Sequence, residues 1–295
     1  MLSHPLRRPP APPLGTKSFG ALARTPLVSV GWYRCAHTHA RRGAEELAPA
    51  YTLNFPRRGV YVKHLEGREH FVAPGSIVFF NRGECWCTSH PHGVGDAGLY
   101  LSVRHDAVLE LARAHQPSVV ERPERVFTSP LATATAELEL AAVALARDAS
   151  VLEPVELEER VLELADAALL RARRVEPEPC DAARHRALAE AARAELVRRA
   201  RQPLGLDELA KPLGVSVYHL CRVFRARFGT SVHAELVRQR LASALEEVAD
   251  GSRELGELAH ALGFASHSHF TLAFRRRFGI TPSAWRASRP KPRGA

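Results

Sequence analysis

The chain has 295 residues, of which 41 are Lys or Arg, 32 are Asp or Glu and 45% are hydrophobic. This length suits two globular domains, and no apolar run approaches the ~18–20 residues that a membrane-spanning helix needs. The five cysteines are odd in number and scattered. They argue against a disulfide framework and favour a reducing, cytoplasmic location.

The positive charge lies in the C-terminal part of the chain. Residues 181–295 contain 20 Lys and Arg against 11 Asp and Glu, whereas residues 1–180 contain 21 of each kind. A basic module attracts polyanions, most often nucleic acid, while a balanced module suits a small ligand or a protein partner. The alternative is that arginine is simply the favoured surface residue of this chain.

Residues 1–44 have the composition of a disordered tail. They contain six prolines and seven basic residues but no acidic one. Such a segment buries too little apolar surface to order itself. An organellar transit peptide is the alternative, which the prolines oppose because they disfavour an amphipathic helix.

Residues 45–174 are predicted to form a strand-rich domain followed by helices. Short β-branched or aromatic runs separated by Gly, Pro and Asn occupy residues 51–103, which predicts a small β-sandwich or barrel. Helical periodicity follows over 131–147, 155–174 and 182–201. The segment 175–183, with Pro177 and Pro179, is the predicted linker to a second domain at 184–290.

The C-terminal part contains two copies of one unit. Glu208-Leu209-Ala210 recurs 49 residues later as Glu257-Leu258-Ala259, and FRARFG at 224–229 recurs 50 residues later as FRRRFG. The second copy therefore has one extra residue in its turn. Each copy has a short helix, a glycine-containing turn and a longer helix, which is the pattern of a helix-turn-helix unit that places its second helix in the DNA major groove.

Helical spacing separates two faces on each longer helix. Leu220, Val223, Phe224 and Phe228 form one apolar stripe, and Phe270, Ala273, Phe274 and Phe278 form the other. The opposite faces carry the candidate DNA-binding residues. These are Tyr218, Cys221, Arg222 and Arg225 in the first helix and His267, Ser268, Thr271 and Arg275 in the second, with Leu272 beside them.

The C-terminal part closely resembles the DNA-binding domain of AraC/XylS-type bacterial transcription regulators. The segments that carry the resemblance are LDELAKPLGVSVYHLCRVFRARFG and LGELAHALGFASHSHFTLAFRRRFGITPSAWR. The resemblance covers about residues 190–288. It implies seven helices, with a long helix at about 233–249 joining two helix-turn-helix units. It also maps base reading onto Tyr218, Cys221, Arg222, His267, Ser268 and Thr271. Family members commonly activate transcription by contacting RNA polymerase.

The chain departs from the family pattern at three positions. Pro212 lies inside the first short helix, where it removes a backbone hydrogen bond and is expected to kink the helix. Leu272 stands where the family often has a polar or basic residue, so the second unit is expected to read fewer bases. Gly256 weakens the start of its helix.

The strand-rich part is weakly similar to the cupin-like sensor domains found beside this DNA-binding domain. The run PGSIVFFNRGE at 74–84 resembles the second cupin motif, but Trp86 stands where that motif has its metal-binding His. An organic effector is therefore the expected ligand, with no cofactor. The proposed pocket residues are Phe55, Arg57, Arg58, His64, His70 and Trp86.

Two alternatives remain open for this N-terminal half. Cys85, Cys87, His90 and His92 carry the ligand types of zinc or a soft metal, although their spacing suits one ion only if the chain turns sharply after Ser89. A cupin-type enzyme is the other alternative. No catalytic motif is recognisable in the chain, so catalytic residues are not expected.

The sequence as a whole predicts an α+β protein with an N-terminal β-sandwich and trailing helices, followed by an all-α tandem helix-turn-helix domain. Its expected function is that of a sequence-specific, effector-responsive transcriptional activator. The expected partners are double-stranded DNA, RNA polymerase, a small-molecule effector and a second copy of the chain, which would associate through helices between residues 131 and 174.

Overall fold

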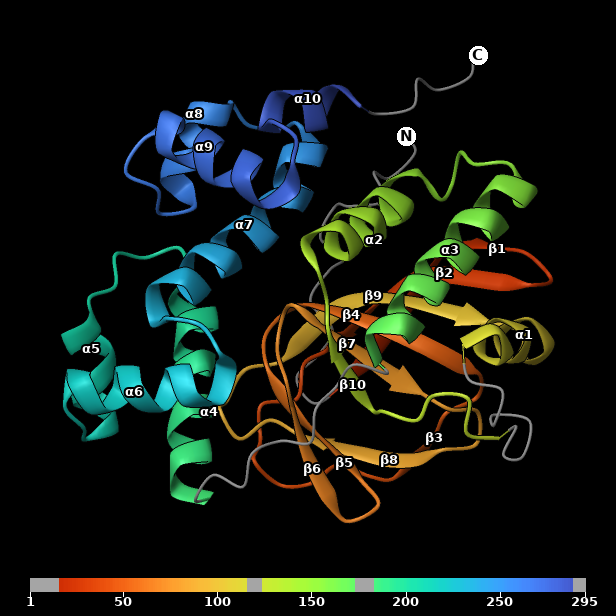
Figure 1. The fold of residues 1–295 in the computed structure, drawn as a ribbon, viewed down its shortest axis with the longest axis horizontal. Helices are drawn as coiled ribbons and strands as arrows, with labels where there is room; N and C mark the ends of the chain where they lie inside the picture. The colour runs from red at the N-terminus through yellow and green to blue at the C-terminus, as the bar shows by residue number, and fades with distance from the viewer. Residues whose placement is uncertain (1–15, 116–123, 173–182, 289–295) are drawn as a thin grey trace. The chain divides into compact units, whose positions relative to one another are not determined.

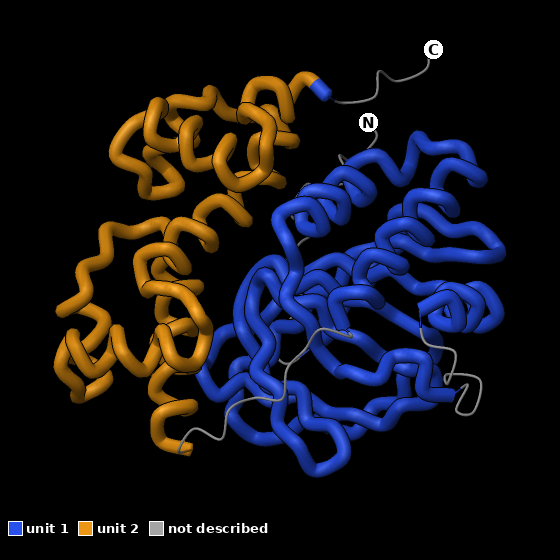
Figure 2. Tube along the Cα trace, viewed as in Figure 1, with its two compact units in different colours: residues 1–175, 288–295 blue, residues 176–287 orange. Residues whose placement is uncertain are grey.

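The computed structural model describes residues 16–115, 124–172 and 183–288. Figure 1 shows their helices and strands, and Figure 2 the division of the chain into two compact units, residues 1–175 with 288–295 and residues 176–287. The predicted α+β class, with a strand-rich first part and an all-α second part, is confirmed. The predicted linker at 175–183 lies almost wholly outside the described residues.

Unit 1 is built on two antiparallel sheets. The larger has the strand order β1-β2-β9-β4-β7-β10, and the smaller has the order β3-β8-β5-β6. Their bounds are β1 Lys17–Arg24, β2 Val28–Cys35, β3 Glu46–Leu47, β4 Tyr51–Arg58, β5 Tyr61–Leu65, β6 Arg68–Val72, β7 Ser76–Phe80, β8 Cys85–Ser89, β9 Asp96–Val103 and β10 Leu131–Thr133.

The two sheets pack face to face because each buries one apolar side. One cluster joins Val78 and Phe80 of β7 in the larger sheet to Tyr61 and Val72 of β5 and β6 in the smaller. Side-chain burial alternates along β4, which is the period-2 pattern of a strand with one face in the core. Tyr51, Leu53 and Phe55 are buried, whereas Thr52 and Asn54 are half-buried. The result is a β-sandwich, as the strand spacing predicted.

Three helices pack with the sandwich in unit 1: α1 (His105–His115), α2 (Ala136–Asp148) and α3 (Pro154–Ala172). Helix α3 contacts β9 and β10 of the larger sheet and both other helices. Its buried stripe contains Leu157, Val161, Leu164 and Ala168, at the helical spacing read from the sequence.

Two expectations for the first unit are wrong. Residues 17–35 are not part of a disordered tail but form β1 and β2, which pair with each other and join the larger sheet through β9. A Pro- and Arg-rich composition does not indicate this strand pairing. The pairing also requires glycine at position 20, where a Cβ would collide with the Trp32 ring. Residues 131–133 form strand β10 rather than the start of a helix.

Unit 2 consists of the seven predicted α-helices within the residues described, plus one short 3-10 helix. They are α4 Ala183–Arg199, α5 Leu206–Ala210, η2 Lys211–Leu213, α6 Val217–Phe228, α7 Val232–Asp250, α8 Leu255–Ala261, α9 His267–Phe278 and α10 Pro282–Ala287. As expected, Pro212 interrupts the first short helix, which continues as η2. Its counterpart α8 is uninterrupted.

Helix α7 joins the two halves of this unit. It contacts α4 and α6 on one side and α8, α9 and α10 on the other. Its Glu235 is buried and accepts hydrogen bonds from Arg193 of α4 (2.9 Å), from Arg238 (2.6 Å) and from Gln239 (2.8 Å). Burial acts to raise the pKa of Glu235, but Arg193, Arg238 and Gln239 outweigh it and hold that pKa well below its ordinary value of 4.5.

We predict that Glu235→Gln destabilises the α4–α7 pair by about 3–5 kcal/mol at neutral pH, because the half-buried Arg193 and Arg238 lose their counter-charge. Since the folded-state pKa is lowered, the carboxylate stabilises the fold above about pH 4.5 and loses this effect as the pH falls further. Hydrogen exchange of α7 amides between about pH 2 and about pH 7 measures both effects. The exposed pair of Glu195 and Arg198 gives the control, because Glu195→Gln should cost at most about 1 kcal/mol. Equal protection of α7 in the two variants would contradict the prediction.

Candidate nucleic-acid interface

The two helix-turn-helix units share one turn geometry. After the first short helix, the Gly214 amide donates to Lys211 O (3.1 Å) and the Val215 amide to Ala210 O (3.3 Å). After α8, Gly263 and Phe264 make the equivalent bonds to His260 O and Ala259 O, at 2.9 and 3.0 Å. This is the Schellman pattern, in which a residue with positive φ ends a helix. Gly214 and Gly263 have φ of 67° and 82°, which explains why glycine stands at both places.

The two longer helices also begin and end alike. Ser216 and Ser266 cap α6 and α9, each accepting a hydrogen bond from the amide three residues on, His219 (3.2 Å) and His269 (3.1 Å). Each helix ends at a glycine 13 residues after its cap serine, Gly229 or Gly279, in the left-handed conformation. The 50-residue repeat seen in the sequence is therefore a repeat of backbone geometry.

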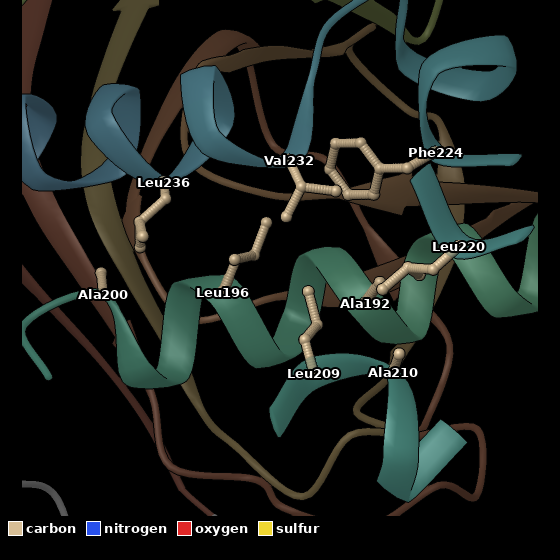
Figure 3. Close-up of a cluster of buried hydrophobic side chains, with 9 residues drawn as sticks. All are labelled: Ala192, Leu196, Ala200, Leu209, Ala210, Leu220, Phe224, Val232 and Leu236. Atoms are coloured by element: carbon tan, nitrogen blue, oxygen red, sulfur yellow. The ribbon is translucent and has the colours of Figure 1, made fainter. Parts of the chain in front are cut away.

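The predicted apolar stripes are buried behind both helices. In α6, Leu220 and Phe224 lie in one core with side chains of α4, α5 and α7, which Figure 3 shows. In α9, Phe270, Phe274 and Phe278 are buried. Phe228 and Ala273, expected in these stripes, are only half-buried. Burial of one face fixes the rotation of each helix about its axis and thereby fixes which residues face outward.

The opposite faces of both helices are open and basic. Tyr218 has 79% of its surface exposed, and Arg222, Arg225, His267, Ser268 and Arg275 are exposed as well. Among the described residues, Arg222, Arg225 and Arg275 form no ion pair with a carboxylate; Arg222 has only a 3.4 Å contact with His219 Nδ1. Arg276, which is not among the predicted DNA-binding residues, is equally exposed and forms no ion pair with a carboxylate of the described residues. The uninterrupted RRR of FRRRFG is the signal that could have identified it.

Arginines on the inner side of unit 2 behave differently. Arg227 of α6 lies 3.5 Å from Glu190, and Arg193 and Arg238 hold Glu235. The structure thus separates arginines that stabilise the fold from arginines whose charge is available to a polyanion. This separation is the electrostatic property that a DNA-binding face requires.

Two of the predicted readers are less accessible. Cys221 and Thr271 occupy equivalent places and are half-buried. The Thr271 hydroxyl oxygen is covered and has no hydrogen-bond partner among the described residues. A base-reading role for Thr271 would need its hydroxyl to rotate outward.

Leu272 occupies the place in α9 that Arg222 holds in α6. It is 51% exposed and borders an open groove of about 540 Å³ between α7 and α9. Val237, Leu241 and Ala273 line the groove together with His269 and Arg276. The second helix therefore combines an apolar centre with basic residues toward its C-terminal end.

The residues proposed for an effector pocket lie in both sheets of unit 1. Phe55, Arg57 and His64 are buried, and Arg58, His70 and Trp86 are half-buried. His64 Nε2 lies 2.8 Å from Ser89 Oγ, and the Trp86 ring packs on Phe80 with centroids 4.8 Å apart. Their grouping around a ligand stays a prediction.

The metal-binding alternative built on Cys85, Cys87, His90 and His92 is wrong as to its ligands. Cys85 is exposed and lies 3.5 Å from Glu45, Cys87 is buried in β8, and the four residues do not converge. Within the described part of the chain, His90 instead converges with Cys35 and Asp96. Neither partner belongs to the Cys- and His-rich run at 85–92, so local spacing could not reveal them.

The comparisons with known proteins agree with this geometry. A model described as a helix-turn-helix domain matches residues 209–288. The regulatory protein SoxS of Escherichia coli is 35% identical over 85 residues, which are 29% of this chain and 79% of that protein. The chain belongs to the AraC/XylS family. Unit 2, with its two helix-turn-helix units, is accordingly the DNA-binding part of a transcriptional regulator.

Two solved structures are similar to this AraC/XylS-family chain as well. An apo form of ToxT from Vibrio cholerae has 12% identity and a TM-score of 0.39, covering 90% of this chain and 98% of its own. A regulator from Chromobacterium violaceum, titled as having an AraC-type DNA-binding domain, has 30% identity and a TM-score of 0.34, covering 36% of this chain and 96% of its own. Separately, none of the helices in the described ranges is long and apolar enough to cross a membrane.

We predict that Gly263→Ala destabilises the second helix-turn-helix unit more than Gly279→Ala does. Both glycines have positive φ, but only at Gly263 would a Cβ meet neighbours, lying 2.9 Å from the Arg240 guanidinium and 3.1 Å from Arg201 O. At Gly279 no atom lies within 4 Å. Hydrogen exchange of α8 and α9 amides in the two variants compares the losses. A larger loss for Gly279→Ala would show that close packing at the turn is unimportant.

Proposed function

We propose that this protein regulates transcription by inserting α6 and α9 into successive major grooves on one face of a DNA duplex. One observation carries the proposal. Two helices with the same caps and the same buried stripe each turn outward a face whose exposed arginines lack carboxylate partners among the described residues. If these arginines were only solvated surface residues, the same arrangement would have no reason to occur at equivalent places in both helices.

Helix α7 supports the two-groove geometry. It has 19 residues and is therefore about 28 Å long. Successive major grooves on one face of B-DNA are about 34 Å apart. A rigid spacer of this length, packed against both helix-turn-helix units, suits simultaneous insertion.

The outward residues divide by chemistry. Arg222 is the strongest base reader because its planar guanidinium can donate two hydrogen bonds to a guanine. His267 and Ser268 supply hydrogen-bonding groups at the start of α9, and Tyr218 and Leu272 supply apolar contact to thymine methyls. Arg225 and Arg275 lie one turn further along each helix, where they suit phosphate contacts.

The remaining parts of the function rest on the family and on unit 1. We propose that the sandwich binds a small-molecule effector, that the DNA-bound protein activates transcription through RNA polymerase, and that two copies associate through the α2–α3 region. Self-association there would cover the exposed apolar side chains of Val151 and Val155, which lie just before and at the start of α3.

Arg222→Ala should weaken binding of the full chain to a selected duplex by about 1–3 kcal/mol while changing affinity for random DNA far less. The two affinities, measured by fluorescence anisotropy at one salt concentration, separate base reading from charge. Arg68→Ala removes an exposed arginine from β6 and should leave both affinities unchanged. An equal loss on both duplexes would remove Arg222 from the base-reading set.

Arg225→Ala and Arg275→Ala should instead weaken binding to both duplexes alike. Each variant loses about one counterion-releasing contact, so the slope of log K against log salt should fall by about 1. A salt titration from about 50 to about 300 mM measures the slope. An unchanged slope in both variants would argue that these arginines do not touch phosphates.

A further inference from the structure

Three chemically active side chains meet inside the sandwich of unit 1, outside the DNA-binding surface. Cys35 is the last residue of β2 and Asp96 the first of β9, and the two are directly opposed in the register of the larger sheet. His90 follows β8 of the smaller sheet. The fold thus brings a thiol, a carboxylate and an imidazole together from both layers.

The three ligand atoms are close and shielded from solvent. They lie within 4.8 Å of one another, and His90 Nε2 is 2.6 Å from Asp96 Oδ1. The exposed fractions are 5% for Cys35, 1% for His90 and 6% for Asp96. Such deep burial distinguishes this cluster from exposed acidic groups, which often lie together without a ligand.

A second imidazole stands beside the three. His37 Nδ1 lies 3.1 Å from Cys35 Sγ, and the His37 ring is stacked on the His90 ring with centroids 6.3 Å apart. His37 is half-buried. The cluster therefore offers one sulfur, two imidazoles and one carboxylate, of which the His37 side reaches toward solvent.

The buried carboxylate of the cluster has little to compensate its charge. Within the part of the chain that the structure describes, Asp96 lies at ion-pair distance from His90 and from no lysine or arginine. Burying a carboxylate costs free energy unless a cation or several donors satisfy it. A divalent cation would supply that charge in one step.

We propose that Cys35, His90 and Asp96, with His37 as fourth ligand, bind one divalent transition-metal ion of the zinc class. Sulfur, imidazole nitrogen and carboxylate oxygen are the zinc ligands of proteins, and four of them make a closed tetrahedral site. Bond lengths of about 2.0–2.3 Å place tetrahedral ligand atoms about 3.3–3.7 Å apart. For Cys35, His90 and Asp96, side-chain shifts on the order of 1 Å reach this geometry, opening the contact between His90 and Asp96, and the His37 side chain turns toward the other three.

The experiment uses the full chain, freed of metal with a chelator and then titrated with Co²⁺ as a spectroscopic probe and with Zn²⁺ as competitor. The wild-type chain should bind one Co²⁺ with a thiolate-to-cobalt charge-transfer band, which Zn²⁺ abolishes. Cys35→Ser should lose the band and bind metal more than about 100-fold more weakly, since even outer-shell substitutions cost about 10–100-fold. Asp96→Asn should likewise weaken binding.

Cys87→Ser is the matched control because Cys87 is a buried cysteine of unit 1 outside the cluster. It should bind Co²⁺ as the wild type does. Absence of a thiolate band in the wild type, or equal losses in Cys87→Ser and Cys35→Ser, would overturn the proposal. If the buried variants fail to fold, the His37→Ala variant decides, because this half-buried position tolerates truncation. A loss of about 10-fold or more in affinity for Co²⁺ supports the four-ligand site. An unchanged affinity for Co²⁺ overturns it. No arm of the experiment depends on DNA binding.

Discussion

The burial of one apolar stripe on each recognition helix is the constraint on which the DNA-binding unit depends. Phe224 in α6 and Phe274 in α9 are both fully buried, so neither helix can rotate about its axis without exposing an aromatic ring. The cost of that exposure, about 1.5–3 kcal/mol for a side chain of this size, fixes the outward face. Sequence-specific contact requires such a fixed face, because hydrogen bonds to base edges tolerate little displacement.

Charge follows the same division. Inward-facing arginines such as Arg193 and Arg227 pair with glutamates of their own unit, whereas Arg222 and Arg275 stay exposed on the outer face. Part of the positive charge of the C-terminal part is therefore carried by the exposed faces of α6 and α9. Fold stability and affinity for a polyanion consequently rest on different arginines, so one can be altered without the other.

The second unit could be predicted from the sequence more completely than the first because its information is local. Cap serines, turn glycines and phenylalanine spacing specify each helix-turn-helix from neighbouring residues, and Pro212 marks the irregular end of the first short helix. Strands β1 and β2 could not be predicted because their stability comes from pairing with each other and with distant β9. The cluster of Cys35, His90 and Asp96 escapes prediction for the same reason, since only the closed sandwich brings these residues together. Thr271 shows that even a correctly placed helix leaves side-chain orientation undetermined.

Insertion of half a helical turn into a duplex bound by the full chain tests the central account most directly. A duplex selected from a random pool should show two protected major-groove segments, about 10 base pairs apart on one face. Inserting ~5 base pairs between the segments rotates one to the far side, so affinity should fall to the level of random DNA, while inserting ~10 should restore part of it. Selection of no preferred sequence, or equal affinity for the original and half-turn duplexes, would contradict a two-groove reader.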